Sequence, residues 1–218
     1  MTHGEAISSE PVEVPSVVHR RRFRWRGTVG VVLLTPAALV TLLADPLVTP
    51  DSWLDVGIDA LAWVAFLAGA GFRFWATLYI GGRKSDFVVA EGPYSLCRHP
   101  LYLGSILLVL SGALFLKSIV FSGALAVLAV AYFRFTVPIE EEYLQARLGD
   151  PYREYCRRVN RLWPYFHHFC TPSRITVDVH SLYLECARAS RWIWLPLFGE
   201  IIGHLRAAPW WPRLFSVP

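Results

Sequence analysis

Residues 92–104 hold the side chains that are best suited to chemistry. A guanidinium (Arg98) and an imidazole (His99) stand directly before Pro100, which opens a long apolar run. Proline is favoured at the first helical position, so a helix is predicted to begin there. Unpaired backbone N–H groups and the positive end of the helix dipole gather at such a start and favour an anion. Because residues 101–116 are apolar enough to lie in a membrane, the sequence predicts an anion site at the boundary between membrane and water.

Three adjacent carboxylates, Glu140–Glu142, form the second candidate group. The residue before a proline disfavours the α region, so Val137-Pro138 is predicted to break or kink the preceding helix, and a new helix is predicted to begin at Pro138. Carboxylates in a first helical turn suit the dipole. Successive helical residues point about 100° apart, so the three cannot face one pocket. Glu142 is expected to face water, and a solvated charge run is the alternative interpretation of the whole group.

The elements that must position these groups are membrane helices. The chain has 218 residues, 54% of them hydrophobic and 17% charged, whereas soluble domains carry about a quarter charged residues. The sequence predicts an all-α integral membrane protein with four transmembrane helices, helices at the cytosolic interface, and a fifth C-terminal segment that is re-entrant or membrane-spanning. The four helices are predicted at about 28–44, 56–80, 100–116 and 119–137.

The charges of successive loops predict the orientation. Arginine and lysine gather before residue 27, in 81–99 and in 147–161, whereas the loop 45–55 carries aspartates and neither basic residue. Positive loops stay on the cytoplasmic side. The prediction is a multi-pass protein of the plasma (inner) membrane whose active site faces the cytoplasm.

The chain is predicted to divide into a disordered basic N-terminus (1–27), a membrane domain (28–164) and an extension (165–218). After a predicted C-cap at Gly149, a helix with arginines and a tyrosine face is expected to lie on the leaflet surface. The apolar stretch from Trp192 to Leu205 is short and contains Pro196, which favours an interfacial or re-entrant segment over a fifth crossing.

Other chemistries find less support in the sequence. No strand followed by Gly-x-Gly-x-x-Gly is present, which disfavours a soluble dinucleotide domain. His167, His168 and Cys170 match no standard zinc spacing, so no metal is predicted. The four cysteines show no paired framework and are predicted to be free thiols. No nucleic acid and no obligatory protein partner is expected.

Two blocks of residues resemble the isoprenylcysteine carboxyl methyltransferase family and its relatives, which include phospholipid methyltransferases. Gly-Pro-Tyr followed by Arg-His-Pro-x-Tyr-x-Gly forms the first block, within a resemblance from about Arg73 to Pro164. The second block follows a hydrophobic hairpin and comprises Glu140-Glu141, Leu144, Gly149, Tyr152, Tyr155, Arg158-Val159 and Pro164. The resemblance implies a membrane-embedded methyltransferase that uses S-adenosylmethionine and acts on a lipophilic small molecule or lipid.

The resemblance also assigns residues to the cofactor. The positions it implies for S-adenosylmethionine are Asp86, Phe87, Val88, Val89, Tyr94, His99, Pro100, Leu101, Tyr102 and Glu140. His99 and the helix start would hold the cofactor's carboxylate, Glu140 its amine, and the tyrosines and valines its adenine.

Three further residues are predicted to be catalytic: Arg98, Glu141 and Arg158. Glu141 is a candidate general base for an amine or hydroxyl acceptor, whereas a carboxylate acceptor needs none. The alternative interpretation of Arg98 is an interface residue whose charged end reaches the water. The alternative interpretation of Arg158 is a residue that binds a lipid headgroup.

One departure from the family bears on the acceptor. The family often has arginine one helical turn before the carboxylate pair, where this chain has Thr136, and the nearest arginine is Arg134. A prenylcysteine carboxylate is therefore in doubt as substrate, and other lipids stay open. A membrane reductase of the sterol-reductase type that uses NADPH, and a scaffold without catalysis, are the two alternative functions.

Overall fold

The computed structural model describes residues 32, 34–45, 47–81, 87–212 and 214. Within these ranges the chain consists of helices joined by loops, without a strand. The all-α prediction is therefore confirmed for the described chain. The predicted disordered segment 1–27 lies outside these residues.

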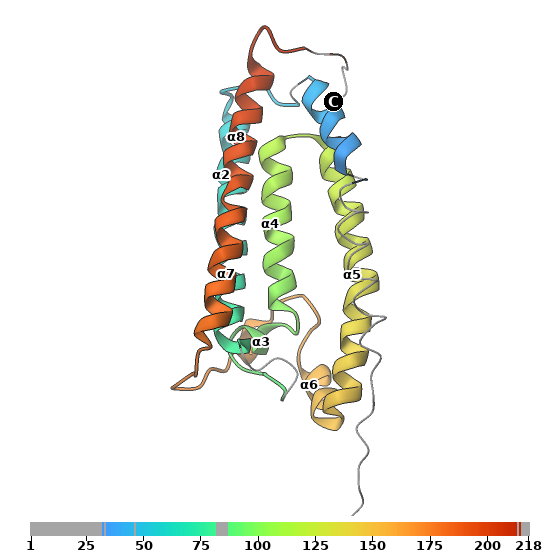
Figure 1. Cartoon of the computed structure of the whole chain (residues 1–218), viewed down its shortest axis with the longest axis vertical. Helices are drawn as coiled ribbons and strands as arrows, with labels where there is room; N and C mark the ends of the chain where they lie inside the picture. Colours follow the sequence, from blue (N-terminus) through green and yellow to red (C-terminus); the bar gives the residue numbers. More distant parts are fainter. Residues whose placement is uncertain (1–31, 33, 46, 82–86, 213, 215–218) are drawn as a thin grey trace, which may run out of the picture.

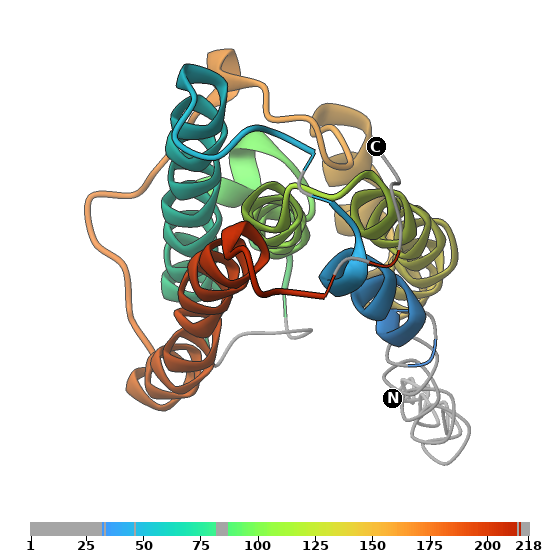
Figure 2. The same ribbon diagram turned by 90° about the horizontal axis from the view of Figure 1, so that it is seen from above.

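The long helices run side by side along the longest axis of the molecule (Figure 1). They are α2 (Trp53–Ile80), α4 (Pro100–Leu116), α5 (Ile119–Leu148), and α7 (Val179–Trp192) with α8 (Trp194–Ala207) stacked end to end. Seen from above, α4 lies centrally, with α2 and the α7–α8 column on one side and α5 on the other (Figure 2). A shorter apolar helix, Leu34–Leu43, lies beside the start of α5. The centre of the bundle is therefore the helix that begins at Pro100.

Two described helices, α2 with 28 residues and α5 with 30, are long and apolar enough to cross a membrane. Large apolar side chains such as Leu61, Leu67, Val130 and Phe135 stay exposed along them, as expected for surfaces in contact with lipid. The apolar helices Leu34–Leu43 and Pro100–Leu116 are shorter. The bounds of α4 agree with the prediction, whereas the count of four spanning helices is not confirmed.

Helix α5 continues through Pro138 to Leu148, so the prediction of a helix break there was wrong. Membrane-type helices tolerate proline because neighbouring groups satisfy the freed backbone, and Thr136 and Val137 beside it are buried. Glu140 and Glu141 consequently lie near the C-terminal end of a long helix rather than in a first turn. The two carboxylates therefore do not lie at the positive end of a helix dipole.

Helices α2 and α4 approach each other closely at two glycines. A Cβ atom added to Gly104 would lie 2.7 Å from the carbonyl oxygen of Gly69 and 2.5 Å from Cγ of Arg73. Small residues let membrane helices pack backbone to backbone. The last glycine of the 92–104 motif therefore serves packing, and it leaves room for the arginine stem that crosses it.

The C-terminal extension forms helices that pack along the bundle. Helix α7 contacts α2, and α8 contacts α4. The interfacial or re-entrant placement of this segment in a membrane stays a prediction. Asp178 accepts a hydrogen bond from the backbone N–H of Ser181 at 2.9 Å and caps α7. The division at residue 165 stays a prediction.

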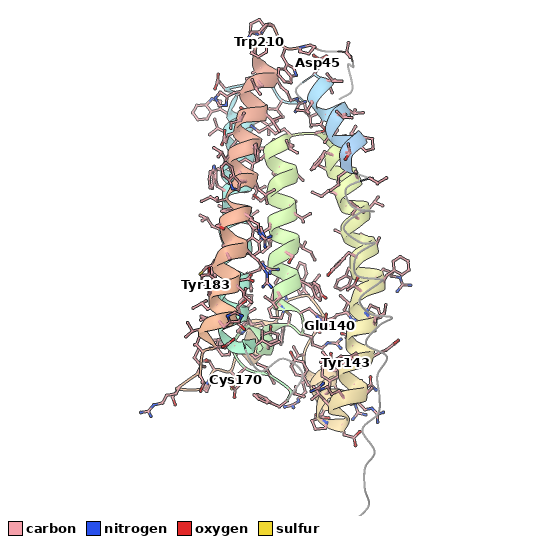
Figure 3. All side chains as sticks on the ribbon, viewed as in Figure 1. Asp45, Glu140, Tyr143, Cys170, Tyr183 and Trp210 are labelled. Atoms are coloured by element: carbon pink, nitrogen blue, oxygen red, sulfur yellow. The ribbon has the colours of Figure 1, made fainter. Side chains whose placement is uncertain are left out.

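The loops and short helices separate into two ends (Figure 3). Glu140, Tyr143 and Cys170 lie at one end, with α3 (Pro93–Leu96), α6 (Asp150–Arg158) and the 3₁₀ helix η1 (Phe166–His168). Asp45 and Trp210 lie at the other end. Since α4 begins at the first end, the residues predicted to do chemistry are gathered there.

Candidate functional site

The cofactor residues predicted from the sequence gather around one cavity of about 560 Å³. Of the predicted set, Asp86 lies outside the described residues. All the others line this cavity: Phe87, Val88, Val89, Tyr94, His99, Pro100, Leu101, Tyr102 and Glu140. The structure therefore brings together side chains from a loop, the short helix α3, the start of α4 and the distant part of α5.

The cavity has an apolar extension along α4 and α5. Its wall there is made of aliphatic and aromatic side chains, namely Ile106, Val109, Leu125, Leu128, Ala129 and Phe133. These residues lie in the middle of the two helices, away from the polar groups near residue 100. The space therefore joins a polar compartment to an apolar slot, an arrangement that suits an amphiphilic molecule.

Glu140 is the carboxylate that faces the cavity. The hydroxyl of Tyr102 donates a hydrogen bond of 2.5 Å to its Oε2. The Tyr102 ring in turn lies edge-on to that of Tyr132, with 5.7 Å between ring centroids. Charge at a fixed position on a cavity wall favours a cationic group, here one that would lie beside Glu140.

Tyr94 supplies a buried hydroxyl to the same cavity. The residue is only 5% exposed, and among the described residues its hydroxyl has no hydrogen-bond partner. The backbone carbonyl of Tyr94 is held by the hydroxyl of Tyr155 at 2.8 Å. Burial, followed by the charge of Glu140, raises the pKa of Tyr94. The phenol therefore stays protonated and can donate a hydrogen bond to a ligand.

Glu141 does not line the cavity and is occupied by other partners. Its carboxylate accepts from Nε2 of His99 at 3.1 Å, from Arg98 at 3.0 Å, and from both Nε and Nη2 of Arg161. Two guanidinium groups and these hydrogen bonds favour its ionised form. A carboxylate held in this way is poorly placed to take a proton from an acceptor, so the geometry gives Glu141 a positioning role instead of the predicted general base.

The same contacts fix the start of α4. The backbone N–H of Arg98 donates to the carbonyl of Asn160 at 2.8 Å, and that of His99 donates to the carbonyl of Arg161 at 3.2 Å. Together with Glu141, these bonds tie the motif to the loop that follows α6. His99 therefore has one ring nitrogen engaged by Glu141, while its side chain still lines the cavity.

The structure separates the arginines that were predicted to be catalytic. Arg98 lines the cavity and contacts Glu141. Arg158 has a 68% exposed side chain that pairs with Glu154 four residues earlier, on the outer face of α6. Tyr152 and Tyr155 occupy the buried face of that short helix. Arg158 therefore does not reach the cavity, and Arg161, which sequence reasoning missed, contacts Glu141.

Arg73 and Glu185 are two further residues that sequence reasoning missed. Nε of Arg73 donates to Glu185 at 2.8 Å, and Nη1 donates to Ser105 at 2.6 Å. Arg73 and Ser105 both line the cavity. An arginine inside the apolar run 56–80 was the available signal, because charged residues within membrane helices are rare and mark function.

Covalent and metal chemistry find little support in the described residues. Cys97 is buried, and burial raises the pKa of its thiol to about 11, so it is a poor nucleophile. No group of three or more histidine, cysteine, aspartate or glutamate residues in the described part of the chain could hold a metal ion.

Comparisons with known proteins match part of the chain to a family model. Residues 60–150 match the sequence model of the phospholipid methyltransferase family. Protein-S-isoprenylcysteine O-methyltransferase B of Arabidopsis thaliana is 32% identical over 90 residues, which are 41% of this chain and 46% of that protein. The resemblance predicted from the sequence is thereby confirmed.

Two bacterial relatives align over most of the chain. The nickel-cobalt-cadmium resistance protein NccN of Alcaligenes xylosoxydans xylosoxydans is 29% identical over 209 residues, 95% of each chain. The cobalt-zinc-cadmium resistance protein CzcN of Cupriavidus metallidurans is 28% identical over 187 residues, 86% of each chain. No solved structure matches this chain.

Proposed function

We propose that this chain transfers a methyl group from S-adenosylmethionine to a lipophilic acceptor. Residues 60–150 match the model of the phospholipid methyltransferase family, and part of the chain is similar to an isoprenylcysteine O-methyltransferase, which supports the proposal. The observation that carries the proposal is the joined cavity, in which Glu140, Tyr94 and Tyr102 face a polar compartment that opens into an apolar slot. The cofactor would occupy the polar part and the acceptor's chain the slot.

The polar groups of this cavity fit the cofactor. Glu140 would hold the ammonium group, and the α4 start at Pro100 would attract the carboxylate. When bound, S-adenosylmethionine would supply a methyl group on a cationic sulfur: a nucleophile on the acceptor would attack the methyl carbon, and S-adenosylhomocysteine would leave with the electron pair of the carbon–sulfur bond. Tyr94, Tyr102 and the valines of the 87–89 loop would surround the remaining polar and aromatic parts.

The work of the protein in such a reaction is alignment and exclusion of water. A carboxylate acceptor gives an ester and releases no proton. Because Glu141 is held by Arg98 and Arg161, an acceptor that needs no general base fits this site best.

The position of the site supports a reaction at the cytoplasmic face of the plasma membrane. The cavity lies at the end of the bundle that carries Arg98, Arg153, Arg157 and Arg161, and basic residues favour the cytoplasmic side. The acceptor would enter the slot between α4 and α5 from the bilayer.

Methyl transfer is tested with purified, detergent-solubilised protein, labelled S-adenosylmethionine and a total lipid extract. The wild-type protein should give a labelled lipid. Glu140→Gln keeps the shape of the side chain but loses its charge, and should abolish labelling, whereas the exposed Glu142→Gln serves as the matched control and should label normally. Binding of NADPH in place of S-adenosylhomocysteine would favour the reductase alternative, and binding of neither would favour a scaffold.

The names of the two bacterial relatives support a second, physiological proposal. NccN and CzcN are named as metal resistance proteins and align along most of this chain, so we propose that the methylated product contributes to metal resistance. Cells that lack the protein should grow less well in nickel, cobalt or cadmium. Rescue by the wild type but not by Glu140→Gln would tie the phenotype to methyl transfer, and equal rescue by both would refute that link.

A further inference from the structure

Helix α2 carries an arginine, Arg73, that forms an ion pair well inside the C-terminal end of the helix. Arg73 lies seven residues before the end of α2 at Ile80, which places it roughly 10 Å inside that end at 1.5 Å per residue. Its partner, Glu185 of α7, is only 1% exposed. Charged groups in a membrane helix are costly and are retained mostly for function.

The pair is built from three helices. Nε and Nη2 of Arg73 donate to the two oxygens of Glu185 at 2.8 and 3.3 Å, and Nη1 donates to Ser105 of α4 at 2.6 Å. The Trp192 ring covers the guanidinium, 4.5 Å from its carbon to the ring centroid. These contacts leave the arginine one position, and Gly104 provides the space for its stem.

The cluster has an excess of positive charge. Glu185 accepts from Arg188 at 2.8 Å as well as from Arg73, so two guanidinium groups share one carboxylate. A pair that served only to hold α7 against α2 could be replaced by apolar side chains without loss of stability. The surplus charge, next to a cavity, points to a ligand that is an anion.

Donors from this cluster meet Tyr94 at the cavity. Arg73, Ser105 and Tyr94 all line it, and the hydroxyl of Tyr94 has no partner among the described residues. The cavity thus presents the carboxylate of Glu140 on α5, and on another side the guanidinium of Arg73 and the hydroxyl of Tyr94.

We propose that Arg73, positioned by Glu185, and the hydroxyl of Tyr94 bind the anionic group, a carboxylate or a phosphate, of the lipophilic acceptor. The acceptor is then an anionic amphiphile whose chain occupies the slot between α4 and α5. This inference rests on the proposed methyl transfer, and it gives the C-terminal extension, which lies outside residues 60–150, a part in selecting the substrate. The cofactor's own carboxylate is the other source of the same chemistry.

The test compares a fluorescent long-chain carboxylic acid with its methyl ester on the full-length protein in detergent at pH 8. Arg73→Gln alone would leave the buried Glu185 paired only with the half-exposed Arg188, and the loss of its buried partner would destabilise the chain. The double variant Arg73→Gln with Glu185→Gln removes both charges at once. Tyr94→Phe removes only the hydroxyl. A double variant of the distant ion pair, Lys117→Gln with Asp55→Asn, is the matched control, because neither residue lines the cavity.

The wild type and the control should bind the acid about tenfold or more tightly than the ester, the range expected for a hydrogen bond to a charged group. The Arg73–Glu185 double variant should bind both equally, and Tyr94→Phe should show a reduced preference. The affinity for S-adenosylhomocysteine should stay unchanged in the double variant and in the control.

Two results would overturn the inference. A tenfold loss of S-adenosylhomocysteine affinity in the double variant, with the preference for the acid retained, would assign Arg73 to the cofactor. An unchanged preference and unchanged cofactor affinity, with only a lower unfolding temperature, would reduce the pair to a packing element. Failure of the wild type itself to bind S-adenosylhomocysteine would contradict the proposed function, and this is measured separately from the preference for the acid.

Discussion

Both ends of the bundle hold partly buried charges, but the two ends use them differently. At the far end, Lys117 lies 2.6 Å from Asp55 and 2.7 Å from Asp59, and Arg206 donates to backbone carbonyls, including those of Leu116 and Asp45. None of these residues lines the cavity. At the cavity end, Glu141 is equally engaged, whereas Glu140, Tyr94 and Arg73 face the cavity.

The difference shows how charge is divided between holding the fold and binding a ligand. The charged side chains of the far end hold helix ends together, because each cation there donates hydrogen bonds to acceptors on other helices or loops. At the cavity end, Glu141 has this structural role, whereas the adjacent residue Glu140 faces the cavity. Adjacent residues of one helix therefore have separate roles, and substitutions should separate them.

The largest effect on stability is expected for Glu141→Gln. Removal of its charge leaves Arg98 and Arg161 without their partner at a nearly buried site, and breaking a buried pair costs about 3–5 kcal/mol. Thermal unfolding in detergent should show a clear fall in the midpoint. Normal stability with a loss of turnover alone would restore Glu141 as a general base.

A smaller loss is expected for Gly104→Ala. The added methyl group would meet the Gly69 carbonyl at 2.7 Å and the Arg73 stem at 2.5 Å, and overpacking of this kind costs about 1–3 kcal/mol. Gly57→Ala, near the start of α2 and away from this crossing, has nothing within 4 Å and is the control. Equal unfolding midpoints for both variants would argue against the close crossing of α2 and α4.

The ion pairs of Lys117 at the far end should contribute less to the free energy of unfolding. Burial alone would lower the pKa of Lys117, but its hydrogen bonds to Asp55 and Asp59 outweigh burial and raise it. Its contribution is therefore fully present at neutral pH, below the ordinary lysine value of about 10.4, and is lost only as the pH rises through the higher value. Lys117→Gln should cost about 1 kcal/mol, as partly exposed pairs do, measured as unfolding at pH 7. A change in S-adenosylhomocysteine affinity would contradict the separation of the two ends.

The smallest effect is expected for Glu142→Gln. Its side chain is exposed, in agreement with the direction predicted from the helical repeat, and exposed substitutions usually change stability by less than about 0.5 kcal/mol. Unfolding and methyl transfer should both match the wild type. A loss here as large as that of Glu140→Gln would mean that this part of α5 is rotated.

Local signals in the sequence were sufficient for several elements. Pro100 begins α4, Gly149 ends α5 with a φ of +64°, and the predicted cofactor residues meet at one cavity wherever the structure describes them. These features depend on short-range rules for proline, glycine and helix spacing. The helix break predicted at Pro138 is absent, because the long helix around the proline overrides its local preference against α-helix.

Long-range partners were not accessible in the same way. Arg73 and Glu185 are 112 residues apart, and nothing local shows that an extension predicted to lie at the interface packs on α2. Arg161 was passed over in favour of Arg158 because the sequence cannot show which side of the short helix α6 is buried. Only the fold shows that Arg161 contacts Glu141 while Arg158 stays exposed.

The central claim is that Glu140, and not its neighbour Glu142, is the carboxylate that holds a methyl-donor cofactor. Calorimetry of S-adenosylhomocysteine on purified wild-type, Glu140→Gln and Glu142→Gln protein tests it most directly. We expect binding by the wild type and Glu142→Gln, and a loss of about 1.5–3 kcal/mol in Glu140→Gln, the range for a hydrogen bond to a charged group. Equal affinity in all three proteins, or no binding by the wild type, would contradict the account.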